Sequence, residues 1–345
     1  ESMDEVIIGN VLQAGLGQNP ARQIAIGCGV PVTAAAYTVN QVCGSGLKAI
    51  DLAFRAVRAG EAAAILAGGT ESMSGAPYIL PALRQGARLG DCTACDTVTH
   101  DALTDVFGQY HMGMTAENIA EKFAIPREAQ DAFAVESQRR AAAAMAAGLF
   151  RAEMIPVTVK QRKQEIVIDA DEYPRPQTDL AALAKLRPAF KPDGTVTAGN
   201  ASGINDGSAA VVVAAEDMIQ TRSQCVRIVD VAGIGCAPEL MGLGPIGAVR
   251  KLLKNNGMNP GDIDLWELNE AFAVQSLAVI EQLGLDAAKV NVNGGAIALG
   301  HPVGASGARI AVTLMHQMKR RNATLGVASL CIGGGMGLAI LLENI

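Results

Sequence analysis

The chain has 345 residues, half of them apolar and only 3% aromatic, and its formal net charge at neutral pH is −6. That length allows two or more domains with large cores, and the acidic balance argues against a nucleic-acid binder. No apolar run reaches the roughly 20 residues needed to cross a bilayer, and the acidic start lacks the apolar segment of a signal peptide. Seven scattered cysteines, an odd number, favour free thiols in a reducing compartment. We therefore expect a cytoplasmic protein that binds neither nucleic acid nor a membrane.

Strand and helix patterns alternate over the first 70 residues. Apolar runs bounded by glycine or polar residues predict strands, and the amphipathic runs between them predict helices. Such alternation is typical of a parallel sheet covered by helices. The predicted strands are Glu5–Val11, Ala34–Val42 and Ala62–Gly68, and the predicted helices are Gln18–Gly29 and Ser45–Ala59.

The pattern changes between residues 74 and 203. Prolines, charges and isolated helical runs appear there, among them Thr115–Phe123 and Arg127–Ala147, without clear strand alternation. Strand patterns return at Ser208–Ala215 and Val226–Val231. We therefore predict three parts, which are a first half (1–73 and 204–222), an inserted and mostly helical loop domain (74–203), and a second half (223–345).

The two ends of the chain repeat one pattern. Strand, glycine-rich turn and helix follow one another at Thr38–Val57 and again at Val290–Met315, and in each half a further strand ending in glycines comes next. Internal repetition of this kind indicates two related α/β halves whose turns face one another. Each half would then bring one cysteine to the junction, Cys43 from the first and Cys331 from the second.

Cys43 stands between a predicted strand and two glycines that open a helix. Backbone N–H groups and the helix dipole at a helix N-terminus favour negative charge, so we expect this thiol to lose its proton easily and to act as a nucleophile. Two other interpretations stay open. A free cysteine is often a small buried hydrophobe. Gly44-x-Gly46-x-x-Ala49 also fits a dinucleotide-binding turn, whose acidic partner would be Glu71.

Cys92-x-x-Cys95 has the spacing of redox and zinc motifs. Only His100 lies near enough in the sequence to be a third ligand, and no second pair of cysteines accompanies it. Structural zinc sites take four ligands. We therefore predict no metal site and two ordinary thiols on a loop.

A base for the nucleophile is best sought among the histidines, whose pKa suits proton transfer near neutrality. His301 lies on the glycine-rich turn of the second half, although a structural role stays open for it. Two cysteines can divide the work of joining two thioesters, because one carries an acyl group while the other moves a proton. Both steps place negative charge on a carbonyl oxygen, so backbone N–H groups of the glycine turns and Asn269 are candidate oxyanion stabilisers.

Four blocks of sequence resemble the thiolase family, in the same order and from the first strand to the last. They are Val39–Gly46, Asn269–Ala273, Asn293–Gly307 and Cys331–Gly337. Two further blocks, His111–Asn118 and Thr195–Gly203, resemble in particular its short-chain acetyl-CoA acetyltransferases. The resemblance implies an α/β fold with a layered α-β-α-β-α core of two βαβαβαββ halves, each with a five-stranded sheet, and usually a homotetramer (a dimer of dimers). Thiolases also begin with a strand and a helix ahead of the equivalent of Glu5, and that unit is absent here.

The resemblance also implies how the residues divide the chemistry. Cys43 would accept the acyl group with His301 as its activator, and Cys331 would take the α-proton of a second acetyl-CoA. Asn269, through a water, and His301 would form one oxyanion site, while the backbone N–H groups of Cys43 and Gly333 would form the other. The implied reaction condenses two acetyl-CoA to acetoacetyl-CoA and coenzyme A, runs in reverse as thiolysis, and needs no cofactor.

Contacts with coenzyme A are implied in the same way. Ser202 and His111 would touch the pantetheine arm, and Arg175 would lie near the nucleotide. Ala182 stands where some relatives carry a serine close to the adenine. The other implied binding residues, most of them lining the tunnel for the arm, are Met112, Leu103, Phe190, Ala198, Gly203 and Phe272.

Three rival functions are weighed against this one. Other condensing enzymes with a thiolase fold lack a second cysteine in a Cys-x-Gly-Gly-Gly block, so Cys331 decides against them. A broader-chain 3-ketoacyl-CoA thiolase of fatty-acid degradation is the nearest alternative. A non-catalytic acyl-CoA-binding subunit of the same fold would need none of the chemistry of Cys43 and His301.

Overall fold

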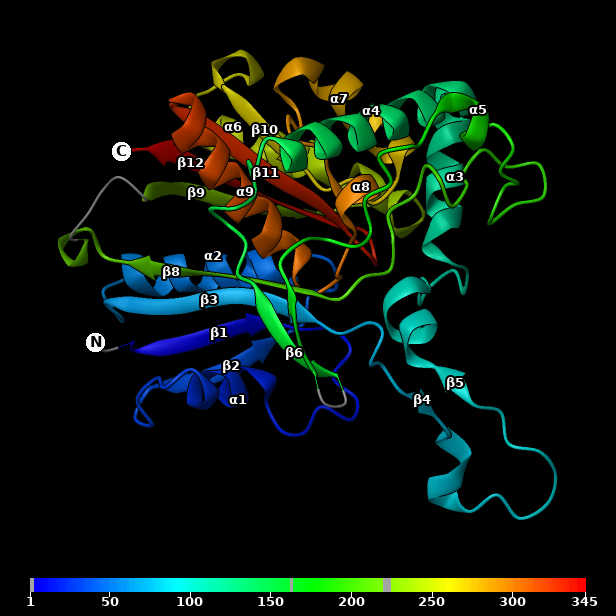
Figure 1. The fold of residues 1–345 in the computed structure, drawn as a ribbon, viewed down its shortest axis with the longest axis horizontal. Coiled ribbons are helices and arrows are strands. Elements are labelled where there is room, and N and C mark those ends of the chain that lie inside the picture. The colour runs from blue at the N-terminus through cyan, green and yellow to red at the C-terminus, as the bar shows by residue number, and fades with distance from the viewer. Residues whose placement is uncertain (1–2, 162–163, 220–224) are drawn as a thin grey trace.

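The computed structural model describes residues 3–161, 164–219 and 225–345. Over these residues the chain forms two four-stranded sheets, with helices between them and on both outer sides (Figure 1). This is the five-layer order that the sequence predicted. The predicted boundary between residues 222 and 223 lies outside the described residues.

The first sheet combines three N-terminal strands with one strand that follows the insertion. The strands are β1 (Glu5–Gly9), β2 (Ala35–Val39), β3 (Ala64–Glu71) and β8 (Gly207–Ala214), in the order β2-β1-β3-β8. β1 runs parallel to both of its neighbours, whereas β8 runs antiparallel to β3. The carboxyl ends of the three parallel strands therefore meet at one edge, where the chain turns toward the second half.

The second sheet repeats this arrangement. Its strands are β9 (Val226–Gly235), β10 (Leu265–Leu268), β11 (Leu325–Ile332) and β12 (Met336–Asn344), in the order β10-β11-β12-β9. β10 and β11 are parallel, and β12 is antiparallel to both β11 and β9. Cys331 lies at the carboxyl end of β11, opposite Gly337 of β12.

Three expectations about the sheets were wrong. Both sheets are mixed, because β8 and β12 run antiparallel to the strands beside them. Each sheet has four strands rather than five over the described residues. The strand expected at Val290 is reduced to a single parallel bridge with Trp266, since Asn291 turns the chain away with a φ of 46°, a left-handed conformation that breaks a strand.

Helices fill the middle layer and cover the outer faces (Figure 1). α2 (Ser45–Arg58) and α9 (Ser306–Arg321) lie between the sheets, α1 (Pro20–Gly27) covers the first sheet, and α6 (Gly244–Asn255) and α7 (Ala273–Leu283) cover the second. A further turn of helix, α8 (Ala296–Leu299), precedes α9. One apolar core runs through both sheets and the middle helices, so the two halves are bound by burial of apolar surface.

Glycines allow the backbones of the two halves to touch. A Cβ atom on Gly69 of β3 would lie 2.1 Å from the carbonyl oxygen of Gly304, and one on Gly46 of α2 would lie 2.9 Å from the nitrogen of Ala308. Real side chains do not tolerate such distances. The small-residue composition therefore sets how closely the first half approaches the turn that follows His301.

The insertion supplies the remaining elements. They are β4 (Tyr78–Ile79), β5 (Cys95–Asp96), α3 (Met112–Phe123), α4 (Arg127–Ala146), β6 (Val157–Gln161), β7 (Gln164–Ile168) and α5 (Leu180–Leu183). α3 and α4 pack against α7 of the second half. The segment with β4 and β5 forms an arm that projects away from the body (Figure 1).

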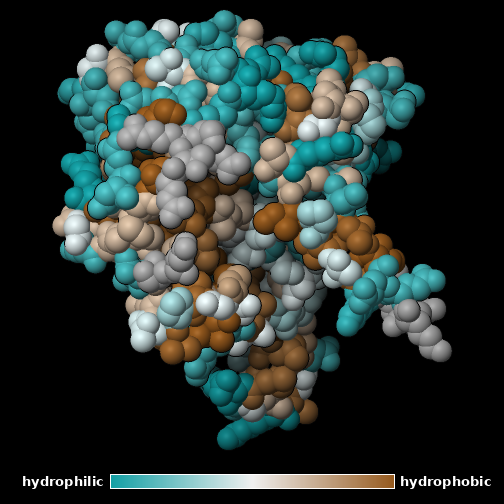
Figure 2. Space-filling view, turned by 60° about the vertical axis from the view of Figure 1, so that its left-hand side comes forward, coloured by the Kyte–Doolittle hydropathy of each residue, from teal (hydrophilic) through white to brown (hydrophobic). Residues whose placement is uncertain are grey.

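The surface carries both polar and apolar regions. Figure 2 shows apolar residues gathered in the middle of one face, below a largely hydrophilic region. Exposed apolar side chains include Ile155 and Val157 at the start of the β6–β7 hairpin and Val212 on β8. In the described part of the chain, no helix combines the length and the apolar character needed to cross a membrane.

Candidate active site

The two cysteines singled out in the sequence lie close together although 288 positions separate them. Cys43 lies two residues before the first residue of α2, and Cys331 is 1% exposed near the end of β11. Burial raises the pKa of the Cys331 thiol, and the charge of the nearby Cys43 raises it further. Each half thus brings one thiol to the junction, as the internal repeat predicted.

The expected easy ionisation of Cys43 is wrong for the free protein. Burial raises the pKa of this thiol to about 11, although the backbone N–H groups of Gly333 and of Cys43 itself act in the opposite direction. Desolvation of a thiolate outweighs the favourable field at a helix N-terminus. The thiol is therefore protonated at neutral pH and needs a base when it reacts.

Val42 holds Cys43 in a strained turn. Its φ is 48°, in the left-handed region that a β-branched residue rarely adopts. The turn is fixed by hydrogen bonds from the nitrogen of Val42 to Asn40 Oδ1 and from Ser45 Oγ to the carbonyl oxygen of Val42. Strain of this kind is typical of functional turns, where surrounding contacts impose it.

His301 is 8% exposed and is held at both ring nitrogens. Its Nδ1 lies 2.5 Å from Ser306 Oγ, and that hydroxyl donates its own proton to the carbonyl oxygen of Pro302. The hydroxyl can therefore only accept from Nδ1–H, which leaves Nε2 as the basic nitrogen. Asn269 Nδ2 lies 3.4 Å from that Nε2. The imidazole is thus fixed in the tautomer that accepts a proton at Nε2.

Burial, with a smaller contribution from the positive charge of Arg309, lowers the pKa of His301 to about 4. The imidazole is consequently neutral at physiological pH. A neutral imidazole with a free lone pair on Nε2 is the form that a general base requires.

Two backbone donors for a developing oxyanion meet at Cys43, and Asn269 lies beside His301. The backbone N–H of Gly333 approaches the Cys43 sulfur together with the N–H of Cys43 itself. Asn269 is fully buried, and its Oδ1 has no hydrogen-bond partner among the described residues. Met112 and Val42 press against Gly333, where a Cβ atom would lie 2.9 Å from Met112 Cε.

The loop 197–203 is hydrogen-bonded to two catalytic turns, the one that follows Asn269 and the one that contains His301. The nitrogen of Ser202 donates to the carbonyl oxygen of Ala271, and the nitrogen of His301 donates to the carbonyl oxygen of Gly203. A Cβ atom on Gly203 would collide with the ring of Tyr173, 2.3 Å away. This loop and the two catalytic turns therefore form one connected wall.

Apolar side chains from the insertion surround the thiols. His111 caps α3 through Nδ1 and stacks on Phe190 at 4.6 Å, and Phe190 meets Phe272 edge to face at 6.2 Å. Met112 and Phe272 share a buried cluster with Cys331, whereas Leu103 packs in the cluster that contains Cys43.

Two predicted binding residues lie outside these clusters. The backbone nitrogen of Arg175 donates to Gln138 Oε1 beside α4. Ala198 is exposed on the turn 197–200. Neither residue belongs to the apolar clusters that contain the two thiols.

The dinucleotide interpretation of the turn at Gly44 is wrong. Its required carboxylate, Glu71, is 2% exposed and accepts hydrogen bonds from Asn10 Nδ2 and from the backbone nitrogens of Val11, Leu12 and Gly304. No oxygen of this carboxylate is left for a ribose. Glu71 instead ties the first sheet to the turn that follows His301.

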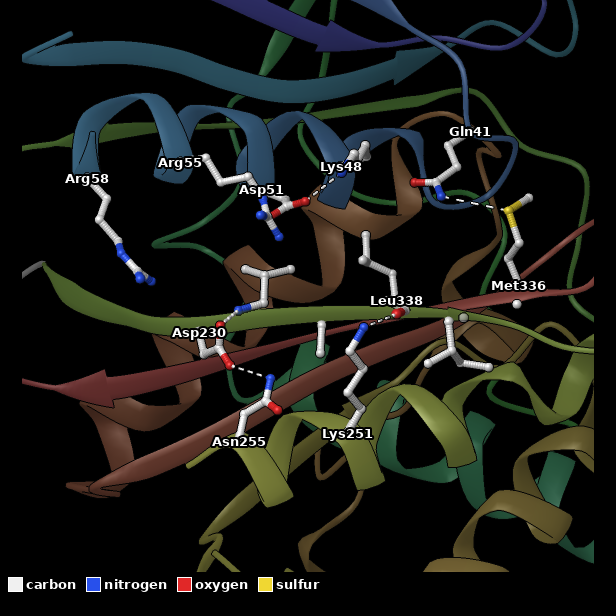
Figure 3. Close-up of a pocket in the computed structure, with 16 residues that line it drawn as sticks. Gln41, Lys48, Asp51, Arg55, Arg58, Asp230, Lys251, Asn255, Met336 and Leu338 are labelled. Carbon is white, nitrogen blue, oxygen red and sulfur yellow. Dashed lines mark hydrogen bonds and ion pairs between the residues drawn. The ribbon is translucent and has the colours of Figure 1, made fainter. Parts of the chain in front are cut away.

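A separate groove of about 680 Å³ lies between α2 and β9 (Figure 3). Asp51 is buried there and pairs with both Lys48 and Arg55 at 2.7 Å, and Lys251 donates to the carbonyl oxygen of Gly233. Neither thiol lines the groove. Because Cys43 does not line it, this groove is not the place where a thioester would meet that thiol.

Sequence reasoning assigned no role to Ser306, although the residue lies within the block that contains His301. Its small hydroxyl, five positions after the histidine on a glycine-rich turn, was a local signal. Glu117 gave no such signal. Its buried carboxylate accepts from the backbone nitrogens of Thr195 and Val196 and so holds the start of the 197–203 loop.

Two matching α/β halves that each bring one thiol to their junction define the thiolase class of fold. Comparison with known proteins agrees with this. Residues 1–217 match the thiolase N-terminal domain and residues 222–344 match the thiolase C-terminal domain. The chain belongs to the thiolase family, and the predicted family and fold are confirmed.

Curated relatives are similar over the whole chain. An acetyl-CoA acetyltransferase of Chromobacterium violaceum is 56% identical, and one of Escherichia coli K12 is 54% identical; each alignment covers 100% of this chain and 88% of the relative.

Solved structures are similar as well. The acetyl-CoA acetyltransferase of Bacillus anthracis matches with a TM-score of 0.96 at 43% identity, over 100% of this chain and 88% of that one. Human mitochondrial 3-ketoacyl-CoA thiolase in complex with CoA matches with a TM-score of 0.95 at 47% identity, over 100% and 87%.

Proposed function

We propose that this thiolase is an acetyl-CoA acetyltransferase, which condenses two acetyl-CoA to acetoacetyl-CoA and coenzyme A and also catalyses the reverse thiolysis. The observation that carries the proposal is the electrostatic coupling of two thiols, the partly buried Cys43 and the buried Cys331, together with a neutral His301 whose basic nitrogen is Nε2. The names of the curated relatives support acetyl-CoA as the substrate.

In the first half-reaction Cys43 attacks the thioester carbonyl. Because the thiol is protonated in the free enzyme, its proton moves to His301 Nε2 as the sulfur–carbon bond forms. The oxyanion lies against the N–H groups of Cys43 and Gly333. Collapse of this intermediate breaks the bond to coenzyme A, which leaves as a thiol with the proton from His301, and acetyl-Cys43 remains.

In the second half-reaction the Cys331 thiol gives its proton to His301 Nε2, and its thiolate then removes the α-proton of a second acetyl-CoA. Burial raises the pKa of this thiol, which makes the thiolate a strong base. Negative charge on the enolate oxygen faces His301 and, through a water, Asn269. The carbanion attacks acetyl-Cys43, a carbon–carbon bond forms and the bond to sulfur breaks. The Cys43 sulfur regains a proton from His301, and Cys331 keeps the α-proton, so the enzyme returns to its starting state.

Coenzyme A is bound by the wall built from the insertion and the 197–203 loop. Ser202 and His111 contact the pantetheine arm, and Arg175 lies near the nucleotide. The apolar contacts come from Leu103, Met112, Phe190, Ala198, Gly203 and Phe272. The stacked rings and the adjoining apolar clusters support this assignment.

The direct test is to incubate the protein with acetoacetyl-CoA and free coenzyme A and to measure how fast acetoacetyl-CoA disappears through thiolysis. We expect Cys43→Ala to be inactive, and full activity in that variant would refute the nucleophile assignment. Cys331→Ala should take up acetyl label at Cys43 but form little acetoacetyl-CoA. Normal condensation by that variant would show that another group moves the α-proton.

A broader-chain 3-ketoacyl-CoA thiolase is the second candidate, because the human mitochondrial enzyme of that name has nearly the same structure. Thiolysis rates with 3-ketoacyl-CoA substrates of increasing chain length separate the two functions. A rate that falls steeply beyond acetoacetyl-CoA supports the first candidate, and a flat series supports the second.

Three further features belong to the proposal. The protein assembles as a homotetramer through the projecting arm, on which Tyr78, Leu83 and Leu89 expose apolar side chains. It acts in the cytoplasm, a reducing compartment that suits a chain with an odd number of scattered cysteines. Its parts are the two halves and the insertion at 74–203, with β8 returning to the first half.

A further inference from the structure

Asn291 is a buried asparagine beside β10 that has no role in the chemistry described above. It is 2% exposed, and its backbone is left-handed, with a φ of 46°. Asparagine is one of the few residues other than glycine that adopt this conformation readily. The backbone nitrogen of Asn291 donates to the carbonyl oxygen of Trp266 at 2.9 Å. This contact brings the Asn291 side chain alongside the end of β10.

The carboxamide of Asn291 takes the place of a neighbouring strand there. β10 pairs with β11 along one edge of the sheet. On its other side the nitrogen of Leu268 donates to Asn291 Oδ1 at 2.8 Å, and Asn291 Nδ2 donates to the carbonyl oxygen of Leu268 at 2.9 Å. One residue of an antiparallel strand would make the same pair of bonds. Leu268, the last residue of β10, is therefore held as though the sheet continued.

The same carboxamide holds Glu270, two residues further along the chain. Asn291 Nδ2 donates its second proton to Glu270 Oε1 at 2.8 Å. Glu270 Oε2 accepts from Ser137 Oγ at 2.6 Å and from the nitrogen of Ile297 at 3.2 Å. Each of these residues is at most 3% exposed, so solvent competes little for the bonds. Glu270 is therefore fixed from three segments of the chain.

Asn269 lies between the two residues that Asn291 holds. Its backbone nitrogen donates to the carbonyl oxygen of Ser329 on β11 at 3.0 Å. Its side chain has fewer contacts, because Nδ2 lies 3.4 Å from His301 Nε2 while Oδ1 has no hydrogen-bond partner among the described residues. The direction of this side chain therefore depends on the backbone that carries it, which is fixed on both sides.

We propose that Asn291 is a positioning residue for Asn269: its carboxamide holds the backbone of Leu268 and the carboxylate of Glu270, and so aims Asn269 at the enolate oxygen of the second half-reaction. The structural part of this proposal stands on the hydrogen bonds described above. Its consequence for catalysis rests on the proposed function, in which Asn269 acts on that oxygen through a water.

The two half-reactions should respond differently to loss of the carboxamide. The oxyanion of the first half-reaction lies against the N–H groups of Cys43 and Gly333, which Asn291 does not hold. The enolate of the second faces Asn269. A residue that merely supports the fold would affect both half-reactions alike, so the ratio of their rates identifies a positioning role.

Asn291→Gly removes the carboxamide and keeps the backbone conformation, because glycine adopts a left-handed φ at no steric cost. We expect condensation of acetyl-CoA, and exchange of its methyl protons with deuterium from D₂O, to fall about 10- to 100-fold, since a misplacement of about 1 Å has an effect of that size. Exchange of labelled coenzyme A into acetyl-CoA should fall less than about threefold, because it needs acetyl-Cys43 and its backbone donors but not the enolate.

Asn322→Gly is the matched control. Asn322 also has a left-handed φ, 51°, but it is exposed and lies at the opposite end of α9 from Ser306. The control should leave both rates unchanged. If Asn291→Gly does not fold, Asn291→Asp replaces it, because aspartate tolerates the left-handed conformation. An ionised aspartate keeps an acceptor for the nitrogen of Leu268 but has no N–H to donate, so the same difference between the two rates is expected.

Equal losses in both rates would show that Asn291 only supports the fold, and unchanged condensation would show that it does not orient Asn269. Either result overturns the proposal. A crystal structure of the variant gives a readout without activity. We expect the Asn269 carboxamide to have moved from its place beside His301 Nε2, and an unmoved carboxamide also overturns the proposal. If the unchanged protein neither exchanges coenzyme A nor condenses acetyl-CoA, the proposed function fails, while the crystal structure still decides whether Asn291 positions Asn269.

Discussion

Gly69→Ala tests whether backbone contact between the two halves sets the geometry of the His301 turn. A Cβ atom at this position would lie 2.1 Å from the carbonyl oxygen of Gly304 and 2.9 Å from the Cα of Ala305. Ordinary contacts between such atoms are about 3.5 Å. One half must therefore move by roughly 1 Å, and no flexible side chain is available to give way.

Overpacking of a tight core costs about 1–3 kcal/mol, and an overlap with backbone atoms belongs at the upper end. We expect Gly69→Ala to lower the free energy of unfolding by about 3 kcal/mol in urea titrations. We also expect a fall of roughly 100-fold in kcat, because a displacement of about 1 Å at a reacting group has that effect.

Gly27→Ala is the matched control, since the same methyl group added at the end of α1 meets nothing within 4 Å. It should leave activity unchanged and stability equal to or slightly above that of the original protein. Neutral surface substitutions change the free energy of unfolding by about 0.5 kcal/mol or less. If Gly69→Ala changes it by no more than that and keeps full activity, the argument from backbone contact is wrong.

Three other predictions concern single groups. Ser306→Ala removes the acceptor of the His301 Nδ1 proton, and kcat should fall about 10- to 100-fold with little change in KM; an unchanged kcat would show that the hydroxyl does not orient the ring. Asp51→Asn breaks the ion pairs of a buried carboxylate with Lys48 and Arg55, whose side chains are partly exposed. The free energy of unfolding in urea should therefore fall by about 1–2 kcal/mol. An unchanged value would mean that the cost of desolvating the carboxylate fully offsets the attraction in the two ion pairs. Iodoacetamide alkylates the thiolate form of a cysteine, and the variant Cys43→Ala gives the background reaction of the other thiols. The rate of alkylation of Cys43 should rise about tenfold per pH unit until the pH approaches the pKa of about 11. A rate that stops rising near pH 8 would contradict the raised pKa.

The sequence by itself determined the order of the elements and the main candidates of the site. Apolar strands and glycine-rich turns are local signals, so the predicted strands near β1 and β3 and the helix α2 agree with the structure to within a few residues. The thiolase blocks placed Cys43, His301 and Cys331 at the carboxyl ends of strands or on adjoining turns. Such blocks can be recognised in a sequence because backbone geometry restricts which residues a tight turn accepts.

Only the tertiary structure decided what the environment does to those residues. A helix N-terminus suggested an easily ionised Cys43, yet burial by segments far apart in the chain raises its pKa instead. Glu71 suggested a ribose contact, yet it binds the backbone of Gly304, which is 233 positions away. Desolvation and contacts between distant segments depend on how the two halves pack, and no local sequence pattern records that packing.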